Sequence, residues 1–512
     1  MERSLNRIVA INTLSNYGLI AVRILYVILL TRFLYRALGE DYYGFWSILW
    51  AFFTYVAIFN FGFGATVQKF TAEHLFETEP EKYNKIISIV LLAYCAVSVI
   101  ILGVVALGVA NMHAWTNISN PTILSDCKSA LVVFGIGMAI LFPLSTFVDI
   151  LTGLRLIYLK NIVMILLRIV EIIGIYGLIA GKAEFIVFVA FSTIINVLFT
   201  AYLIIVVKQK IPSFKFIPRP DFKVFGEIWN FSLFVYLNSL AMLITAKTDR
   251  FVLSSILGLP AVSAYQIGTR LPEMSQSLSS QFQDNVIPVA SNLAKKNDIS
   301  GLKNILVNGM RFSAFVSIGT TAFFYILTPQ TILILFGFCS EEVISICRMF
   351  LISQLMYCAV RNVPYRYLQV SNKHKYIAMI SILQAISTIG LGIWLCNKIG
   401  TIGIAWAALI SNIVFPVFFI FPVAVYKLKI TFKDIFSIYV APTFAVLIAG
   451  TIGYFIRNFM GDNMHSLFAL GIVYLGMGFI YLGISWVVVL SKSERQYLAS
   501  KLVSFVDRKA VA

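Results

Sequence analysis

Residues 12–34 have the sequence NTLSNYGLIAVRILYVILLTRFL, an apolar run with Arg23 near its centre and Arg32 near its end. At about 1.5 Å per residue, a helix of this length crosses the roughly 30 Å of hydrocarbon in a bilayer. The run is longer than the core of a signal peptide, and no small-residue cleavage site follows it. We therefore expect it to remain in the mature protein as a transmembrane helix.

Runs of this kind recur along almost the whole chain of 512 residues. The chain is 59% hydrophobic and only 12% charged, whereas soluble domains contain about 25% charged residues. This composition predicts an all-α integral membrane protein with about fourteen transmembrane helices. The expected spans are 12–34, 43–64, 86–110, 130–150, 160–180, 184–207, 226–247, 262–290, 305–327, 343–366, 376–396, 402–425, 436–456 and 466–490.

The basic residues are distributed unevenly between the loops. Of forty Lys and Arg residues, twenty-seven fall in loops on the side of the N-terminus, eight in the opposite loops and five inside the spans. Because cytoplasmic loops carry the excess of basic residues, this predicts both termini in the cytoplasm and an even number of helices. Orientation against an anionic inner leaflet thus explains the net charge of +17, and no aromatic-basic motif predicts nucleic-acid binding.

The sequence lacks the usual signatures of catalysis and metal binding. The six cysteines have no zinc-type spacing, the four histidines fall in loops, and no HExxH, GxSxG or P-loop pattern occurs. The longest outer loop, near 111–129, is too short to hold a sugar donor and acceptor, which argues against a membrane glycan polymerase. We expect no catalytic residue, no metal and no cofactor.

Two weak echoes suggest an internal repeat. The segment Arg32-Phe33-Leu34 leads to Leu38-Gly39, and Arg250-Phe251-Val252 leads to Leu257-Gly258, about 219 residues further on. A second echo relates the starts of the spans at 160 and 376, at a similar offset. The alternative is that Leu-Gly turns recur by chance in apolar sequence.

The repeat predicts two six-helix bundles related as parallel repeats, since six helices return the chain to the same side of the membrane. Such repeats usually hold a substrate site at their interface. We expect the first bundle at 1–207, a basic cytoplasmic linker at 208–225, the second bundle at 226–430, and two extra helices with a cytoplasmic tail at 431–512.

Several loose motifs resemble those of the multidrug/oligosaccharidyl-lipid/polysaccharide exporter superfamily, and within it the Wzx-type flippases for O-antigen and related repeat units. The resemblance covers nearly the full length. Its motifs are Thr31-Arg32-Phe33-Leu34 with Leu38-Gly39 and Tyr43-Gly44; Phe61-Gly62-Phe63-Gly64; and Gly400-Thr401-Ile402-Gly403 with Ala405, Ala407, Ala408, Ser411 and Asn412.

This resemblance implies two six-helix bundles around a cavity that opens alternately to each side of the bacterial inner membrane. The implied substrate is a lipid-linked oligosaccharide on an undecaprenyl diphosphate carrier, whose tail stays among the membrane lipids while the head crosses. Polysaccharide polymerase and chain-length proteins are the protein partners that it implies.

Charged residues inside the spans are the candidate substrate ligands. Arg23 has no acidic residue within a helical turn, and an arginine at a helix centre costs on the order of 3 kcal/mol. A cavity that supplies guanidinium groups suits an anionic diphosphate, because arginine binds phosphate with two parallel hydrogen bonds. The alternative for Arg23 is a structural pair with an acid on another helix.

Four further residues complete the candidate set. Arg168 and Arg270 each have a glutamate three residues later, so each is either a substrate ligand or half of a structural pair. Asp149 and Asp284, near the inner ends of spans, either take part in ion coupling or are paired and snorkelling.

Three functions are compatible with this class of protein. A lipid-linked oligosaccharide flippase agrees with an arginine in the first span. A cation-coupled multidrug exporter of the same superfamily should instead have unpaired carboxylates in its central helices. A membrane polymerase or acyltransferase is disfavoured by the short outer loops.

Overall fold

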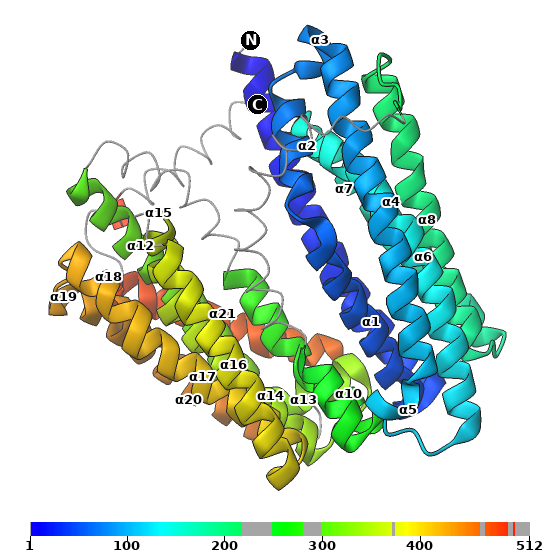
Figure 1. Cartoon of the computed structure of the whole chain (residues 1–512). Helices are drawn as coiled ribbons and strands as arrows, with labels where there is room; N and C mark the ends of the chain where they lie inside the picture. Colours follow the sequence, from blue (N-terminus) through cyan, green and yellow to red (C-terminus); the bar gives the residue numbers. More distant parts are fainter. Residues whose placement is uncertain are drawn as a thin grey trace. The chain divides into compact units, whose positions relative to one another are not determined.

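The computed structural model describes residues 2–217, 248–279, 298–370, 374–460, 466–489 and 495–496 (Figure 1). These residues form helices and no strands. The chain divides into two compact units, unit 1 (Met1–Gln266) and unit 2 (Ile267–Ala512). The all-helical prediction is therefore confirmed for the described residues.

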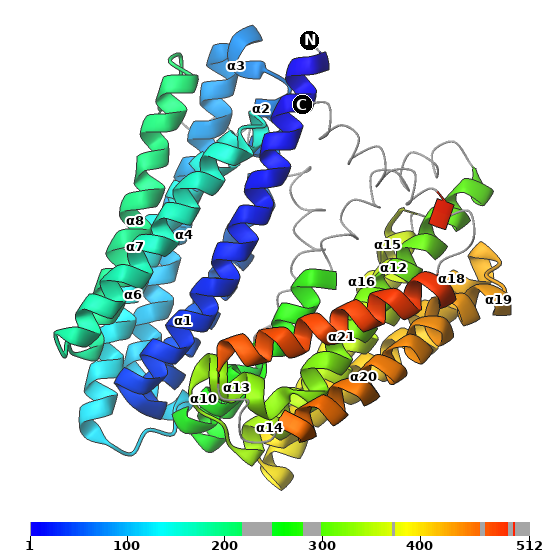
Figure 2. The ribbon, with the colours of Figure 1, turned by 180° about the vertical axis from the view of Figure 1, so that it is seen from behind.

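Unit 1 is a bundle of long helices, with α6 packed against α4 and α8, and α1 packed against α7 (Figure 2). Its last described helix, α10, extends two residues past the boundary of the unit. The bounds are α1 Glu2–Val56, η1 Ala57–Asn60, α2 Phe63–Ala72, α3 Leu75–Thr78, α4 Pro80–Ala110, α5 Met112–Trp115, α6 Pro121–Gly153, α7 Ile157–Ala180, α8 Phe185–Lys210 and α10 Leu259–Gly268.

Helix α1 contains the expected span 12–34 and the first part of the expected span 43–64, joined at one glycine; residues 57–64 fall instead in η1, the turn after it and the start of α2. Its 55 residues would extend for about 80 Å, far more than one crossing needs. The helix is interrupted at Gly39, whose φ of 79° lies in the left-handed region that a side chain disfavours. Gly258 has a φ of 86°, so the two Leu-Gly turns noted in the sequence both depend on a left-handed glycine.

The two glycine turns lie against each other within unit 1. A Cβ atom added at Gly44 would lie 2.3 Å from the carbonyl oxygen of Leu259, so only glycine permits this approach. Nearby, the hydroxyl of Ser263 donates a hydrogen bond of 2.5 Å to the carbonyl oxygen of Glu40. The Tyr43-Gly44 motif therefore has a packing role at this contact.

Unit 2 has the same kind of helices, but three of its spans contain a π-helical segment. These segments, η2, η3 and η4, join α14 to α15, α17 to α18 and α19 to α20 as continuous spans. The bounds are 270–279, α12 Ile299–Ile326, α13 Thr328–Phe336, α14 Glu341–Leu355, η2 Met356–Arg361, α15 Asn362–Val370, α16 His374–Ile399, α17 Thr401–Phe415, η3 Pro416–Ile420, α18 Phe421–Leu428, α19 Phe432–Ile435, η4 Phe436–Val440, α20 Ala441–Met460 and α21 Leu467–Val488.

Ten helices among the described residues are long and apolar enough to cross a membrane, and a bent pair, Ser300–Ile326 with Thr328–Phe336, would make eleven. One of the ten, Leu14–Val56, includes the interruption at Gly39. The expected span 226–247 and the end of 262–290 lie outside the described residues. The total of fourteen and the parallel repeat therefore stay predictions.

Large apolar side chains cover the outward faces of these helices. Val99 and Leu107 on α4 are 70% and 66% exposed, and Phe479 on α21 is 73% exposed. Such a surface would be unfavourable in water, whereas lipid tails are as apolar as the side chains themselves. The chain is a multi-pass membrane protein.

The start of the expected linker packs against α4. The amide of Asn84 donates to the carbonyl oxygen of Ser213 over 3.0 Å, and the backbone N–H of Ile217 donates to the hydroxyl of Ser88 over 2.8 Å. Residues 211–217 are thus held in a non-helical conformation on the bundle, and 218–225 lie outside the described residues.

Candidate functional site

Asparagine side chains join the N-terminal part of α1 to the start of α7. The amide of Asn12 donates to the carbonyl oxygen of Arg155 (2.8 Å), and its oxygen accepts from the backbone N–H of Tyr158 (2.9 Å). One turn further along, Asn161 donates to Asn16 over 2.7 Å. The two partners in each of these hydrogen bonds are 143 to 146 residues apart in sequence. Because this separation is nearly constant, α1 and α7 run parallel and in register.

Arg23 lies two turns beyond these contacts and is exposed on α1. It makes no hydrogen bond or ion pair with any other described residue. The charged groups that affect it are cations: Arg168 and Lys160, both on α7, repel it electrostatically. Arg23 is therefore a guanidinium near the middle of a span with all its donors available.

Arg168 has the opposite environment. Its Nη1 lies 2.5 Å from Oε2 of Glu171, one turn along α7, and the glutamate is fully buried. The other carboxylate oxygen accepts a hydrogen bond from Ser192 on α8. The guanidinium also lies over the rings of Tyr26 and Trp50, at 4.7 Å and 5.9 Å from their centroids. Arg168 is thus held by an ion pair and by two aromatic contacts.

Asp149 on α6 is held at the break between η1 and α2. Its Oδ1 accepts from Nε2 of Gln68 over 2.8 Å. A Cβ atom added at Gly64 would lie 2.6 Å from its Oδ2, so the glycine admits the carboxylate. Asn60 supports this break by accepting from the backbone N–H of Gly64 and from the hydroxyl of Tyr94. The last glycine of the Phe61-Gly62-Phe63-Gly64 motif thus makes room for an acid.

The described charges of this region add up to a positive site. Lys160 is attracted to Asp149 without direct contact, and Arg168 is paired with Glu171. Three cations and two carboxylates leave one net positive charge, and Arg23 is the cation that has no acid beside it. A group of this kind can bind a phosphate or carboxylate through two parallel N–H···O bonds.

The remaining predicted site residues lie elsewhere. Arg270 belongs to unit 2, where its Nη1 is 3.5 Å from Oε2 of Glu273. Asp284 lies outside the described residues. Within the described ranges no group of His, Cys, Asp and Glu residues is placed to hold a metal ion.

Lys160 was not predicted as part of this site, because it is the first residue of the expected span 160–180 and was counted with the basic residues of the cytoplasmic loops. In the structure Lys160 lies in the first turn of α7 and is partly buried. Its spacing of eight residues from Arg168 places the two on neighbouring parts of one helical surface, a signal that the sequence already contained. The loop assignment concealed it.

Comparisons with known proteins agree with this architecture. Residues 6–294 match the family model described as polysaccharide biosynthesis protein. A relative from Bacillus subtilis, the uncharacterized membrane protein EpsK, is 20% identical over 503 residues, which cover 96% of this chain and 97% of that protein.

Solved structures share the fold. The lipid II flippase MurJ in an inward closed conformation aligns with a TM-score of 0.72 at 18% identity, over 93% of this chain and 98% of its own. An inward-facing multidrug resistance MATE family transporter aligns with a TM-score of 0.66 at 16% identity, over 79% and 94%. A MOP superfamily transporter from Pyrococcus furiosus, whose binding pocket is described as having reverse polarity, gives 0.59 at 14% identity, over 83% and 96%. This chain therefore has the fold of the multidrug/oligosaccharidyl-lipid/polysaccharide exporters.

Proposed function

We propose a function from one premise: the chain belongs to the polysaccharide biosynthesis protein family. It is a flippase that carries a polyprenyl-diphosphate-linked oligosaccharide, such as an O-antigen or other surface polysaccharide repeat unit, across the bacterial inner membrane by alternating access. The observation that supports this substrate most directly is Arg23, an exposed and unpaired guanidinium in the first span.

The chemistry of the substrate explains why such a cation is retained. A diphosphate loses its hydration when it leaves water, and an arginine fork replaces those hydrogen bonds while it neutralises charge. An unpaired arginine inside the membrane costs on the order of 3 kcal/mol, so it needs a compensating ligand. The similarity in fold to a lipid II flippase is consistent with a lipid-linked substrate.

The other candidate residues have supporting roles in this proposal. Lys160 adds a second positive charge near Arg23. Arg168 adds to the positive electrostatic potential of the site, although it is ion-paired with Glu171. Arg270, whose Nη1 lies 3.5 Å from Oε2 of Glu273, stays a candidate substrate ligand within unit 2. Asp149, at the break before α2, is the candidate for ion coupling, since interrupted helices often hold ion sites in transporters.

A cation-coupled multidrug exporter is the alternative, and the net positive charge of the described site argues against it. A pocket for organic cations needs an available carboxylate. Here Glu171 is ion-paired with Arg168, and the other carboxylate, Asp149, accepts from the neutral amide of Gln68 and attracts Lys160. The free charge of the described site is positive.

Topology gives a first test. In a cysteine-free background, a membrane-impermeant maleimide applied to intact cells should label a cysteine placed at Asn117 and spare one placed at Lys215. Both positions are exposed, so access to the reagent and not burial decides the result. Permeabilised cells should label both positions. Labelling of Lys215→Cys alone in intact cells would contradict cytoplasmic termini.

Deletion of the gene tests the substrate. Without the flippase, undecaprenyl-linked oligosaccharide should accumulate on the cytoplasmic face, because the polar head cannot cross hydrocarbon by itself. The measurement is mass spectrometry of the lipid extract together with the amount of surface polysaccharide, with complementation by the intact gene as control. Normal surface polysaccharide in a strain without a second flippase would contradict the proposal.

A further inference from the structure

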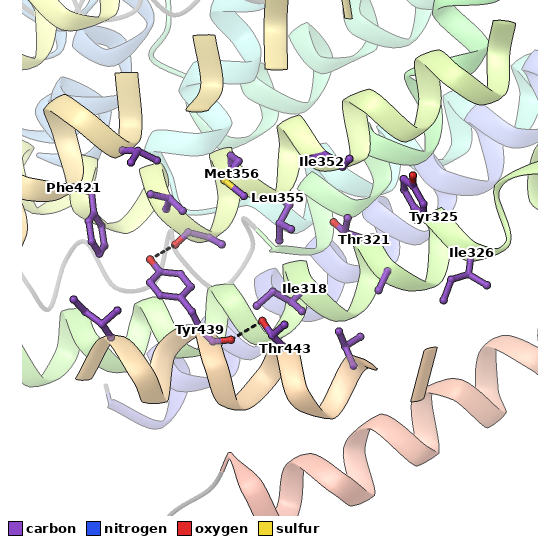
Figure 3. A pocket seen from close by; sticks show the side chains of 16 residues that line it. Ile318, Thr321, Tyr325, Ile326, Ile352, Leu355, Met356, Phe421, Tyr439 and Thr443 are labelled. Carbon is purple, nitrogen blue, oxygen red and sulfur yellow. Dashed lines mark hydrogen bonds between the residues drawn. The ribbon is translucent and has the colours of Figure 1, made fainter. Parts of the chain in front are cut away.

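Unit 2 contains an apolar cavity of about 720 Å³ that the proposed transport site does not include (Figure 3). This volume is within the range of about 300–1,000 Å³ that is typical of ligand pockets. The cavity lies between α12, the α14–η2 span, the η3–α18 span and the η4–α20 span. Each of the three π-helical segments of unit 2 contributes to its wall.

The wall has almost no polar group available to water. The hydroxyl of Tyr439 donates to the carbonyl oxygen of Ala359 over 3.0 Å, and that of Thr443 donates to the carbonyl oxygen of Tyr439 over 2.7 Å (Figure 3). Thr321 is the lining residue whose buried hydroxyl has no partner among the described residues. A buried water needs two to four polar partners, so the cavity suits hydrocarbon and not water.

A cation lies beside this apolar space. Arg348 is on α14, and Ile352, Leu355 and Ala359 follow it at the i+4, i+7 and i+11 positions, on the helical face that lines the cavity. Its guanidinium lies 5.1 Å from the ring centroid of Tyr325, which also lines the cavity. The Nε of Arg348 is buried without a hydrogen bond, and the residue forms no ion pair with any other described residue.

We propose that this cavity binds one acyl chain of an anionic bilayer phospholipid, with the phosphate held by Arg348. Arg348 lies about 10 Å along α14 from Glu341, the first residue of that helix. At this depth an arginine can reach the headgroup region by extending its side chain. A lipid tail can enter an apolar cavity without a desolvation cost. If the cavity stayed empty, its lining side chains would lose dispersion contacts.

Two arguments favour a bulk phospholipid as the occupant of the cavity: the abundance of this lipid in the membrane and the position of the cavity in the protein. Membrane phospholipid is present in large excess over any polyprenyl-linked intermediate, so mass action favours it at a site that recognises a phosphate and a hydrocarbon chain. The cavity also lies wholly in unit 2, and its lining includes none of the cations proposed for the transported head, which are Arg23, Lys160, Arg168 and Arg270. The inference does not depend on the proposed function.

Lipid binding by the full-length purified protein tests the proposal. Native mass spectrometry should show one retained phosphatidylglycerol, and phosphatidylglycerol should raise the melting temperature more than phosphatidylethanolamine with the same acyl chains. Arg348→Gln, which leaves the cavity intact, should weaken phosphatidylglycerol binding about tenfold or more and remove this preference.

A pair of valine substitutions on one span supplies the matched control. Val446 lines the cavity and is 6% exposed, whereas Val440 is 46% exposed. Val446→Phe should fill the space and abolish lipid retention, and Val440→Phe should behave like the unmodified protein. Equal binding of the two phospholipids, an unchanged preference in Arg348→Gln, or retention of a polyprenyl phosphate in place of phospholipid would each overturn the proposal.

Discussion

Replacing Arg23 by alanine should abolish transport while the amount of folded protein in the membrane stays nearly unchanged. The side chain makes no hydrogen bond or ion pair with another described residue, so its removal leaves no described polar group without its partner. Loss of a desolvated charge partner from a bound anion costs about 2 kcal/mol or more, which corresponds to at least about 30-fold in transport rate. The measurement is surface polysaccharide, or transfer of the labelled lipid-linked substrate in vesicles, at equal protein level.

The choice of substitution separates charge from geometry. Arg23→Lys should restore only part of the activity, because an ammonium keeps the charge and loses the planar fork. Arg36 is an exposed arginine further along α1, just before the break at Gly39, so Arg36→Ala is the matched control and should transport normally. Near-normal transport by Arg23→Ala, at equal protein level, would refute the role of Arg23.

Replacing Arg168 by alanine should instead lower the folded yield. Its partner Glu171 is fully buried, so the substitution leaves a carboxylate without a counter-ion inside the bundle. Removal of one member of a buried ion pair typically costs about 3–5 kcal/mol, which is a large part of the stability of a domain. Size-exclusion profiles and melting temperatures in detergent measure the effect.

A second substitution at the same pair should reverse this loss. Arg168→Ala with Glu171→Gln removes the buried charge and keeps an amide that can still accept from Ser192, so much of the yield should return. Lys82→Ala is the control: Lys82 pairs with Glu79 at the same three-residue spacing on an exposed surface, where such pairs contribute about 0–1 kcal/mol. A double variant as unstable as the single one would show that the aromatic contacts of Arg168, and not its ion pair, hold this site.

The contrast between Arg23 and Arg168 shows the limit of spacing arguments. Both are arginines inside spans, and the glutamate three residues after Arg168 correctly indicated an ion pair. Nothing local to Arg23 revealed that Arg168 and Lys160 of another helix lie near it, since those neighbours are more than 130 residues away in sequence. Whether a membrane arginine is available to a ligand depends on such distant neighbours.

The sequence by itself determined the class of the protein and the location of several of its described spans. Hydrocarbon requires a helix of sufficient apolar length whatever surrounds it, so the runs at 86–110 and 130–150 lie within α4 and α6, and the run at 466–490 contains α21. The left-handed glycines at Gly39 and Gly258 are equally local, because a turn between helices needs them before any packing occurs.

Only the tertiary structure decided how polar groups are paired. The approach of Asp149 to Gly64, the asparagine contacts between α1 and α7, and the apolar cavity beside Arg348 all join helices that are distant in sequence. The physical reason is that apolar runs of similar length are nearly interchangeable in lipid, so hydropathy places helices in the membrane without choosing their neighbours. Close packing and hydrogen bonds between helices make that choice, and with it they determine which charges remain available to a ligand.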